Sequence, residues 1–263
     1  MNGLKSIDIG RTIDWGKTST DYATHRPGPP DDFYARLLAL GVGMADQRIL
    51  DLGTGTGVLA RHFAAQASLV SAVDISSEQI DMARLLAKEQ GVTVDFQPSS
   101  AEHLPFDAGT FDVATANQCW LYFDRDAVLD ELERVLKPGG WISTSHFSWL
   151  PRKDEVARQS EALVLKHNPQ WSAADWVGEI PAYPEWARER LRVRAMFYYD
   201  APIIFSRESW RGRIRACRGI GAALNHEQVD AFDREHAELL SKIVPETFTV
   251  LHRIDAHIYE FKN

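Results

Sequence analysis

A chain of 263 residues is long enough to bury a sizeable hydrophobic core, and it predicts one large or one decorated domain. Its formal net charge of −8 argues against a general affinity for the DNA or RNA backbone. The two cysteines lack the spacing of metal ligands, so we expect neither a disulfide scaffold nor a metal site. No run of 18 apolar residues and no charged-then-apolar N-terminus occurs, so we expect no membrane span and no secretion signal, and the cytoplasm is the expected location.

The chain begins with a turn-rich stretch. Prolines at 27, 29 and 30 cannot sustain a helix, so we expect residues 1–30 to form a segment outside the core. Asp31 is then the predicted N-cap of a helix that carries Phe33 and Leu37 and stops at Gly41.

Residues 49–57 read Ile-Leu-Asp-Leu-Gly-Thr-Gly-Thr-Gly and are the most informative segment. The apolar run predicts a buried strand, the glycines a turn, and the residues from Val58 a helix. Such a turn brings backbone N–H groups and the positive end of a helix up to a polar ligand. A dinucleotide site would place its third glycine at Val58. Here Asp51 instead precedes the first glycine by two residues, and a carboxylate there can meet an amino group, which a pyrophosphate lacks.

The following segments alternate between predicted strands and helices. Residues 69–74 predict a second strand that ends in Asp74, about 20 positions after the glycine turn, where a ribose-binding carboxylate is expected. Ser76 and Gln79 form a predicted capping box for a helix that ends near Gly91. Further strands are predicted at 92–96, at 111–116 and after Trp141, and a helix from about 124 to 136.

In this order and spacing, residues 15 to 145 resemble the class I S-adenosylmethionine (SAM)-dependent methyltransferases, in the small-molecule group with methyltransferase type 11 domains. The resemblance implies an α/β fold: a Rossmann-like seven-stranded sheet with the last strand antiparallel, helices on both faces, and a small lid insertion after strand 5. We expect an N-terminal cap at 1–30, a SAM-binding core at 31–146 and 191–263, and a lid or substrate insertion at 147–190. In the last part, the expected elements are a strand at 194–199, a helix after Asn225 and a final strand at 248–261.

The resemblance also implies residue roles toward SAM and its product S-adenosylhomocysteine. Asp51 is expected to orient the methionine amino group, directly or through water, and Asp74 to take the ribose hydroxyls. Ser100 stands where the family often has an aspartate, so adenine selectivity is expected to depend more on Glu102 or backbone groups. The full expected set of cofactor-binding residues is Tyr22, Arg26, Asp51, Gly53, Thr54, Gly55, Asp74, Ile75, Gln79, Ser100, Ala101, Glu102, Asn117 and Gln118.

The acceptor site is predicted less directly. His146 follows the fifth strand and is the candidate catalytic base, although a histidine there is more often structural. Trp120 follows the fourth strand and is a candidate to contact the acceptor. Six of the eight tryptophans, Trp149 among them, fall between residues 141 and 210. This cluster is typical of a lid or a surface on which a flat substrate stacks, and equally of the core of a small subdomain. Nine arginines against three acids lie between 188 and 218, and Arg211 and Arg215 are candidates to hold an anionic acceptor unless they form a solvated basic surface.

The sequence therefore predicts methyl transfer to a small molecule by in-line displacement, with anionic or aromatic acceptors as the candidates. Two alternatives stay open: another outcome with the same cofactor, such as carboxymethyl transfer or decarboxylation, and a SAM-binding regulatory protein without turnover. The acceptor, the methylated atom and the oligomeric state are not determined by the sequence.

Overall fold

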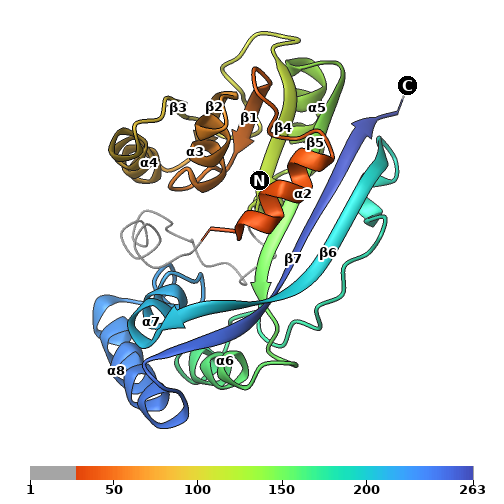
Figure 1. The fold of residues 1–263 in the computed structure, drawn as a ribbon. Coiled ribbons are helices and arrows are strands. Elements are labelled where there is room, and N and C mark those ends of the chain that lie inside the picture. The colour runs from red at the N-terminus through yellow and green to blue at the C-terminus, as the bar shows by residue number, and fades with distance from the viewer. Residues whose placement is uncertain (1–27, 263) are drawn as a thin grey trace.

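The computed structural model describes residues 28–262, which form a seven-stranded sheet with helices on both faces (Figure 1). The strand order is β3-β2-β1-β4-β5-β7-β6. Strands β1 to β5 pair in parallel, whereas β7 pairs antiparallel with both β5 and β6. The predicted sheet with an antiparallel last strand is thereby confirmed. The strands are β1 (Arg48–Leu52), β2 (Leu69–Asp74), β3 (Asp95–Pro98), β4 (Phe111–Asn117), β5 (Leu136–Trp149), β6 (Leu191–Ser206) and β7 (Thr247–Phe261).

The described helices fall mostly where the apolar periodicity predicts them. They are α2 (Asp31–Ala39), α3 (Val58–Ala65), α4 (Ser77–Gln90), α5 (Arg125–Val135), α6 (Glu155–His167), α7 (Arg207–Arg215) and α8 (His226–Ile243), with short 3₁₀ turns at η3 (Trp120–Tyr122) and η4 (Glu185–Ala187). The boundaries differ in detail. Pro30 rather than Asp31 is the N-cap of α2, and β3 begins three residues later than the predicted Val92. Only half of the predicted capping box of α4 forms, because the backbone N–H of Ser76 donates to Asp74 instead of to Gln79.

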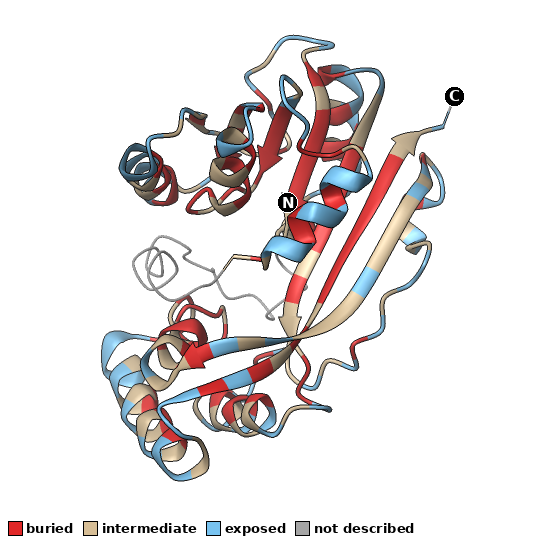
Figure 2. Ribbon diagram, in the orientation of Figure 1, coloured by how far each residue is buried: buried red, intermediate tan, exposed pale blue. Residues whose placement is uncertain are grey.

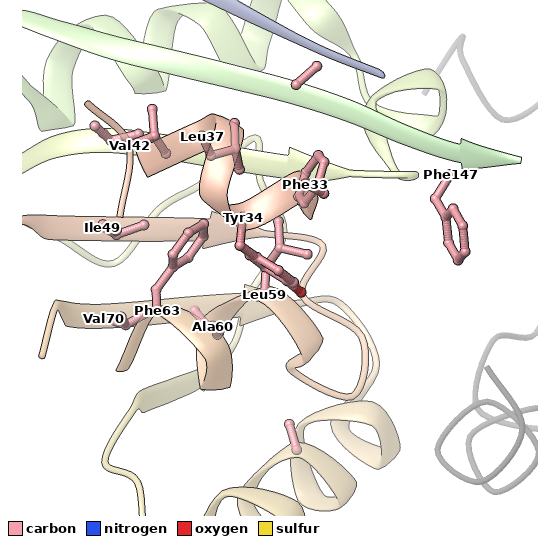
Figure 3. Close-up of a cluster of buried hydrophobic side chains, with 14 of the residues drawn as sticks. Phe33, Tyr34, Leu37, Val42, Ile49, Leu59, Ala60, Phe63, Val70 and Phe147 are labelled. Atoms are coloured by element: carbon pink, nitrogen blue, oxygen red, sulfur yellow. The ribbon is translucent and has the colours of Figure 1, made fainter. Parts of the chain in front are cut away.

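Side chains from alternate positions of the strands build two hydrophobic layers. One layer packs Ile49 and Val70 against α2, α3 and α4. The labelled side chains of Figure 3 show the part of this layer that α2 and α3 contribute. The other packs Leu50 and Leu52 against α5. Figure 2 shows that buried residues dominate the central strands, while the outer side of α2 faces solvent. A strand covered on both faces is apolar at successive positions, which is why residues 49–52 read as an almost continuous apolar run.

The antiparallel pair β6 and β7 is much longer than strands β1 to β4 and extends past them. Its strands contain 16 and 15 residues, and the part around Phe205 and Val250 leaves the main core. There it packs with α6, α7 and α8 into a third hydrophobic cluster (lower part of Figure 1). The expected division assigns 191–263 wholly to the core. Within this division, which stays a prediction, residues 207–243 pack with α6 from the expected insertion, because each of these amphipathic helices needs an apolar partner.

Candidate functional site

The glycine turn lies between β1 and α3 at the carboxyl edge of the parallel strands, where ligands bind in sheets of this kind. Gly53 has φ +54°, and a Cβ atom added to it would lie 2.8 Å from the Cβ and 2.9 Å from the Sγ of Cys119. Gly57 has φ +78° and is the N-cap of α3. The turn can therefore follow this path only with glycine at Gly53, and it leaves its backbone open to a ligand.

Asp74, at the end of β2, is tied to the glycine turn. One of its carboxylate oxygens accepts from the backbone N–H of Gly55 at 2.8 Å, and the other accepts from Ser76 N at 2.9 Å. Burial raises the pKa of Asp74, against the lowering effect of these backbone hydrogen bonds. Each carboxylate oxygen has a second lone pair, so the group can still accept from a ligand hydroxyl.

A cavity of about 970 Å³ opens beside this turn. Gly53, Gly55 and Asp74 line one end of it, together with Ile75. The side chain of Ile75 is 74% exposed, which makes it an apolar surface that a flat ring can cover. Of the expected cofactor-binding residues, the cavity wall contains Gly53, Gly55, Asp74, Ile75, Gln79, Ser100, Ala101, Glu102, Asn117 and Gln118. Nine of these residues come from four separate strand ends and their following loops, and Gln79 comes from the first turn of α4, so the fold brings most of the predicted set together.

Asp51 and Thr54 lie behind the turn and not in the cavity wall. The carboxylate of Asp51 is buried and accepts hydroxyl hydrogen bonds from Thr54 and Thr115, both at 2.6 Å. Burial raises the pKa of Asp51 to about 6, although the two hydroxyls act in the opposite direction. The expected role of Asp51, to orient the methionine amino group directly or through water, stays a prediction. Because Asp51 joins the turn to β4 through the two threonines, it fixes the shape of the turn.

The end of β4 contributes amide groups to the cavity. Gln118 has φ +66°, a left-handed conformation that is uncommon for a residue with a side chain. Its backbone N–H donates to Ser145 O at 2.9 Å, and its side-chain amide donates to Phe147 O. Asn117 accepts from the hydroxyl of Ser145 at 3.0 Å. These hydrogen bonds tie the chain after β4 to β5, and such constrained backbone is common where a ligand is held.

Beyond these amides, aromatic rings form the wall. Trp120 lies 4.8 Å from Trp186 between ring centroids, and both line the cavity. The buried Nε1–H of Trp120 has no acceptor within residues 28–262. Trp149 also lines the cavity, and its indole N–H donates to Glu161 at 2.6 Å. The expected positions of Trp120 and Trp149 beside an acceptor are compatible with this wall.

The two candidate arginines are placed elsewhere. Arg211 and Arg215 both pair with Asp233 of α8, Arg215 at 2.6 Å, and neither lines the cavity. They stabilise the packing of α7 on α8, which is the structural alternative to an anion site. Arg213 and Arg218 of the same basic stretch do line the cavity. Arg213 lies on α7 and Arg218 in the turn that follows it, and both side chains point away from the side that carries Arg211 and Arg215. Tyr22 and Arg26 lie outside the described residues.

One wall of the cavity was not predicted from the sequence, apart from His146. Strands β5 and β7 present a row of polar side chains there: Thr144, His146, Ser148, Asp255, His257 and Tyr259. The available signal is the alternation of polar residues at 255, 257 and 259 with apolar ones between them. That alternation does not say what the row faces, because the neighbouring strand is far away in the chain.

Comparisons with known proteins identify the family of the chain. Residues 50–144 match a family model described as a methyltransferase domain. The chain is 35% identical over 178 residues to the ubiquinone biosynthesis O-methyltransferase of Xanthomonas axonopodis pv. citri (strain 306), a match that covers 65% of this chain and 71% of that protein. The chain belongs to the methyltransferase domain family.

The alignments with other curated relatives cover a smaller part of this chain. The ubiquinone biosynthesis O-methyltransferase of Thiobacillus denitrificans is 36% identical over 129 residues, which cover 48% of this chain and 56% of that protein. The chain thus spans about half the length of the first curated relatives it matches.

Solved structures of methyltransferases share the fold over almost the whole chain. A SAM-dependent methyltransferase from Geobacter sulfurreducens in complex with S-adenosyl-L-homocysteine has a TM-score of 0.56 at 21% identity, covering 97% of this chain and 100% of that one. A second such complex, from Thiobacillus denitrificans, has a TM-score of 0.55 at 19% identity, covering 94% and 98%. Within residues 28–262 of this methyltransferase-family chain, no helix has the length and apolarity needed to span a membrane.

Proposed function

We propose that the protein transfers a methyl group from SAM to an oxygen of a small hydroxylated aromatic acceptor. The observation that supports this best is that one cavity has the glycine turn and Asp74 at one end and indole rings with an imidazole at the other. The curated relatives named O-methyltransferases support oxygen as the methylated atom.

The residues present fit the cofactor. The carboxylate of Asp74 lies in the cavity wall and keeps acceptor capacity for the two ribose hydroxyls. The exposed side chain of Ile75 offers an apolar surface to the adenine. The open glycine backbone and the amides of Asn117 and Gln118 are suited to the amino-acid part of the molecule. Tyr22 and Arg26 are proposed on the family resemblance alone to close this end.

The acceptor end is suited to an aromatic ring. Trp120, Trp149 and Trp186 present large apolar surfaces with one donor each, and such rings hold a flat ligand by stacking or edge contacts. If the acceptor carries a carboxylate, Arg213 and Arg218 supply positive charge to this cavity, whereas Arg211 and Arg215 do not.

The reaction needs positioning, exclusion of water and removal of one proton. SAM supplies a methyl group made electrophilic by its sulfonium centre. The walls of the cavity align the acceptor oxygen with that methyl group, an effect of orientation worth up to about 7–11 kcal/mol in the best intramolecular reactions. The indole rings keep water away while the positive charge disperses. His146 is the group in the cavity wall that is suited to receive the hydroxyl proton.

The proposal is tested by calorimetry and by transfer of a labelled methyl group. We expect SAM and S-adenosylhomocysteine to bind with micromolar affinity, about −8 kcal/mol, and NAD not to bind. Incubation with methyl-labelled SAM and a panel of small phenols should label the phenol. Tight NAD binding without a response to SAM contradicts the cofactor assignment. An altered cofactor, or binding without any turnover, contradicts methyl transfer and favours the corresponding alternative.

A further inference from the structure

The polar wall of the cavity places a buried carboxylate directly opposite His146. In the antiparallel pairing of β5 with β7, His146 and Asp255 are cross-strand partners. Directly opposed side chains lie on the same face of a sheet, and both residues line the cavity. On the other face of β7, Ile254 and Ala256 belong to the main hydrophobic core, so the register of this strand is fixed by burial.

The two side chains are in contact. The Nδ1 atom of His146 lies 3.2 Å from Oδ2 of Asp255. The side chain of Asp255 is 1% exposed, whereas that of His146 is 36% exposed. The carboxylate is therefore held rigidly in the sheet, and the imidazole extends from it into the cavity.

This contact determines which nitrogen of His146 is basic. A carboxylate oxygen accepts hydrogen bonds, so Nδ1 carries the proton and Nε2 keeps its lone pair. Nε2 of His146 has no hydrogen-bond partner within residues 28–262. The Oδ1 atom of Asp255 is buried and accepts no hydrogen bond from these residues either. No other hydrogen bond from these residues competes for the Asp255 carboxylate, so it stabilises a positive charge that forms on the neighbouring imidazole.

His257, the other histidine near this carboxylate, is held in a different way. Its Nε2 lies 2.9 Å from the carbonyl oxygen of Pro181, and a carbonyl can only accept, so this nitrogen carries the proton. Its Nδ1, 3.9 Å from Asp255, then has a lone pair and cannot donate to the carboxylate. Burial lowers the pKa of His257, which keeps the ring neutral. Asp255 is thus paired with His146.

We propose that Asp255 is the positioning residue that makes His146 the base of the reaction. This inference rests on the proposed function. The acceptor O–H bond breaks and its proton moves to Nε2 of His146. The electron pair of the freed oxygen forms the new bond to the methyl carbon, and the carbon–sulfur pair stays with sulfur. The imidazolium is stabilised by the adjacent carboxylate until it loses the proton to water.

Other charged or titratable groups near this pair have to be considered in any pH profile. From β7 these are His257, Tyr259 and Arg253, all of which interact electrostatically with His146 or Asp255. Arg253 is engaged in an ion pair with Asp200 at 2.7 Å. Tyr183, which precedes η4, interacts electrostatically with Tyr259. Burial raises the pKa of Tyr259, so the tyrosine remains neutral around pH 7.

The first test is nuclear magnetic resonance of the intact protein with ¹⁵N-labelled histidine, which needs no substrate. We expect the Nδ1–H tautomer for His146 in the wild type. In Asp255→Asn, which keeps the side-chain volume, we expect the Nδ1–H form of His146 to lose its dominance, because the amide can turn its own N–H toward Nδ1. Asp81→Asn, at an exposed position of α4, is the matched control and should leave His146 unchanged.

The second test is the pH dependence of turnover with a phenol that the wild type methylates. Asp255→Asn should lower kcat at pH 7 by roughly 10- to 100-fold while the dissociation constant for S-adenosylhomocysteine stays within about two-fold. His146→Gln should cause a comparable loss, and the double variant no further loss, because the two residues act as a unit.

The outcomes separate the two proposals. A wild type that methylates no phenol refutes the proposed function, and the base role with it. A wild type that turns over while Asp255→Asn keeps its kcat and pH profile refutes only the role of Asp255. If Asp255→Asn does not fold, the wild-type tautomer decides: an Nε2–H form of His146 overturns the inference.

Discussion

Replacement of Asp51 by asparagine is expected to stabilise the protein, and increasingly so as the pH rises. The fold buries this carboxyl and raises its pKa from 3.8 to about 6, with burial as the largest cause. The folded protein therefore binds a proton more tightly than the unfolded chain does, and stability falls as the pH rises from about 4 to 6. Above that window, the ionised carboxylate costs about 3 kcal/mol relative to its protonated form, at 1.36 kcal/mol per pKa unit. Asparagine carries no charge and does not incur this cost.

The measurement is urea unfolding of the wild type and Asp51→Asn at several pH values. Roughly 1 kcal/mol of the difference should develop between pH 5 and pH 8, because the wild-type carboxyl is still largely unionised in the fold at pH 5. The hydroxyls of Thr54 and Thr115 can each donate or accept, so the amide can replace the carboxylate as their partner. Asp81→Asn, on an exposed face of α4, serves as the control. A free-energy difference that does not change between pH 5 and pH 8 would show that Asp51 is ionised in the fold with an ordinary pKa.

Three further predictions concern the cavity. Asp74→Ala should weaken S-adenosylhomocysteine binding by about 1.5–3 kcal/mol, the range for hydrogen bonds to a charged group, and an unchanged dissociation constant by calorimetry would remove Asp74 from the site. Gly53→Ala should destabilise the protein more than Gly109→Ala in urea unfolding. Both glycines have positive φ, but only at Gly53 would the new methyl group meet another side chain within 3 Å. Equal losses in the two variants would mean that the turn moves to make room. In hydrogen exchange, residues 171–181, which supply several cavity-lining positions, should be protected by S-adenosylhomocysteine, and identical exchange with and without it would identify static packing.

The local sequence was sufficient for most of the parallel half of the fold. The apolar run before Gly53, the glycine turn and the acid at the end of the next strand specify a strand–turn–helix unit by short-range chemistry. Gly91 ends α4 in a left-handed conformation, as predicted, because a glycine adopts it without steric cost. The half-formed capping box shows where this reasoning stops. Ser76 N donates to Asp74, because this acid at the end of β2 lies two residues before the N-cap and takes the N–H that Gln79 would need.

The arginine cluster shows why composition alone could not locate the acceptor. Nine arginines in 31 positions indicate charge, but not where each side chain points. Arg211 and Arg215 are four residues apart on α7 and therefore share one face, which packs on α8 and Asp233. Arg213 lies between them and points to the cavity side. Which of these arginines reaches the cavity depends on which side of α7 is covered by α8. Because α8 begins more than ten residues further along the chain, the local sequence of α7 does not reveal that side.

The sequence by itself determined the parallel strands and the glycine turn, because these depend on neighbours within a few positions, and its resemblance to the SAM-dependent methyltransferases implied most of the residues that line the cofactor end. The tertiary structure alone decided the opposite wall. His146 and Asp255 are separated by 109 positions and meet only because β7 inserts antiparallel between β5 and β6. Strand alternation predicts that residues 255, 257 and 259 share a face. Which strand lies beside them, and at which register, is set by the burial of Ile254 and Ala256 in a core that exists only once the whole sheet has formed.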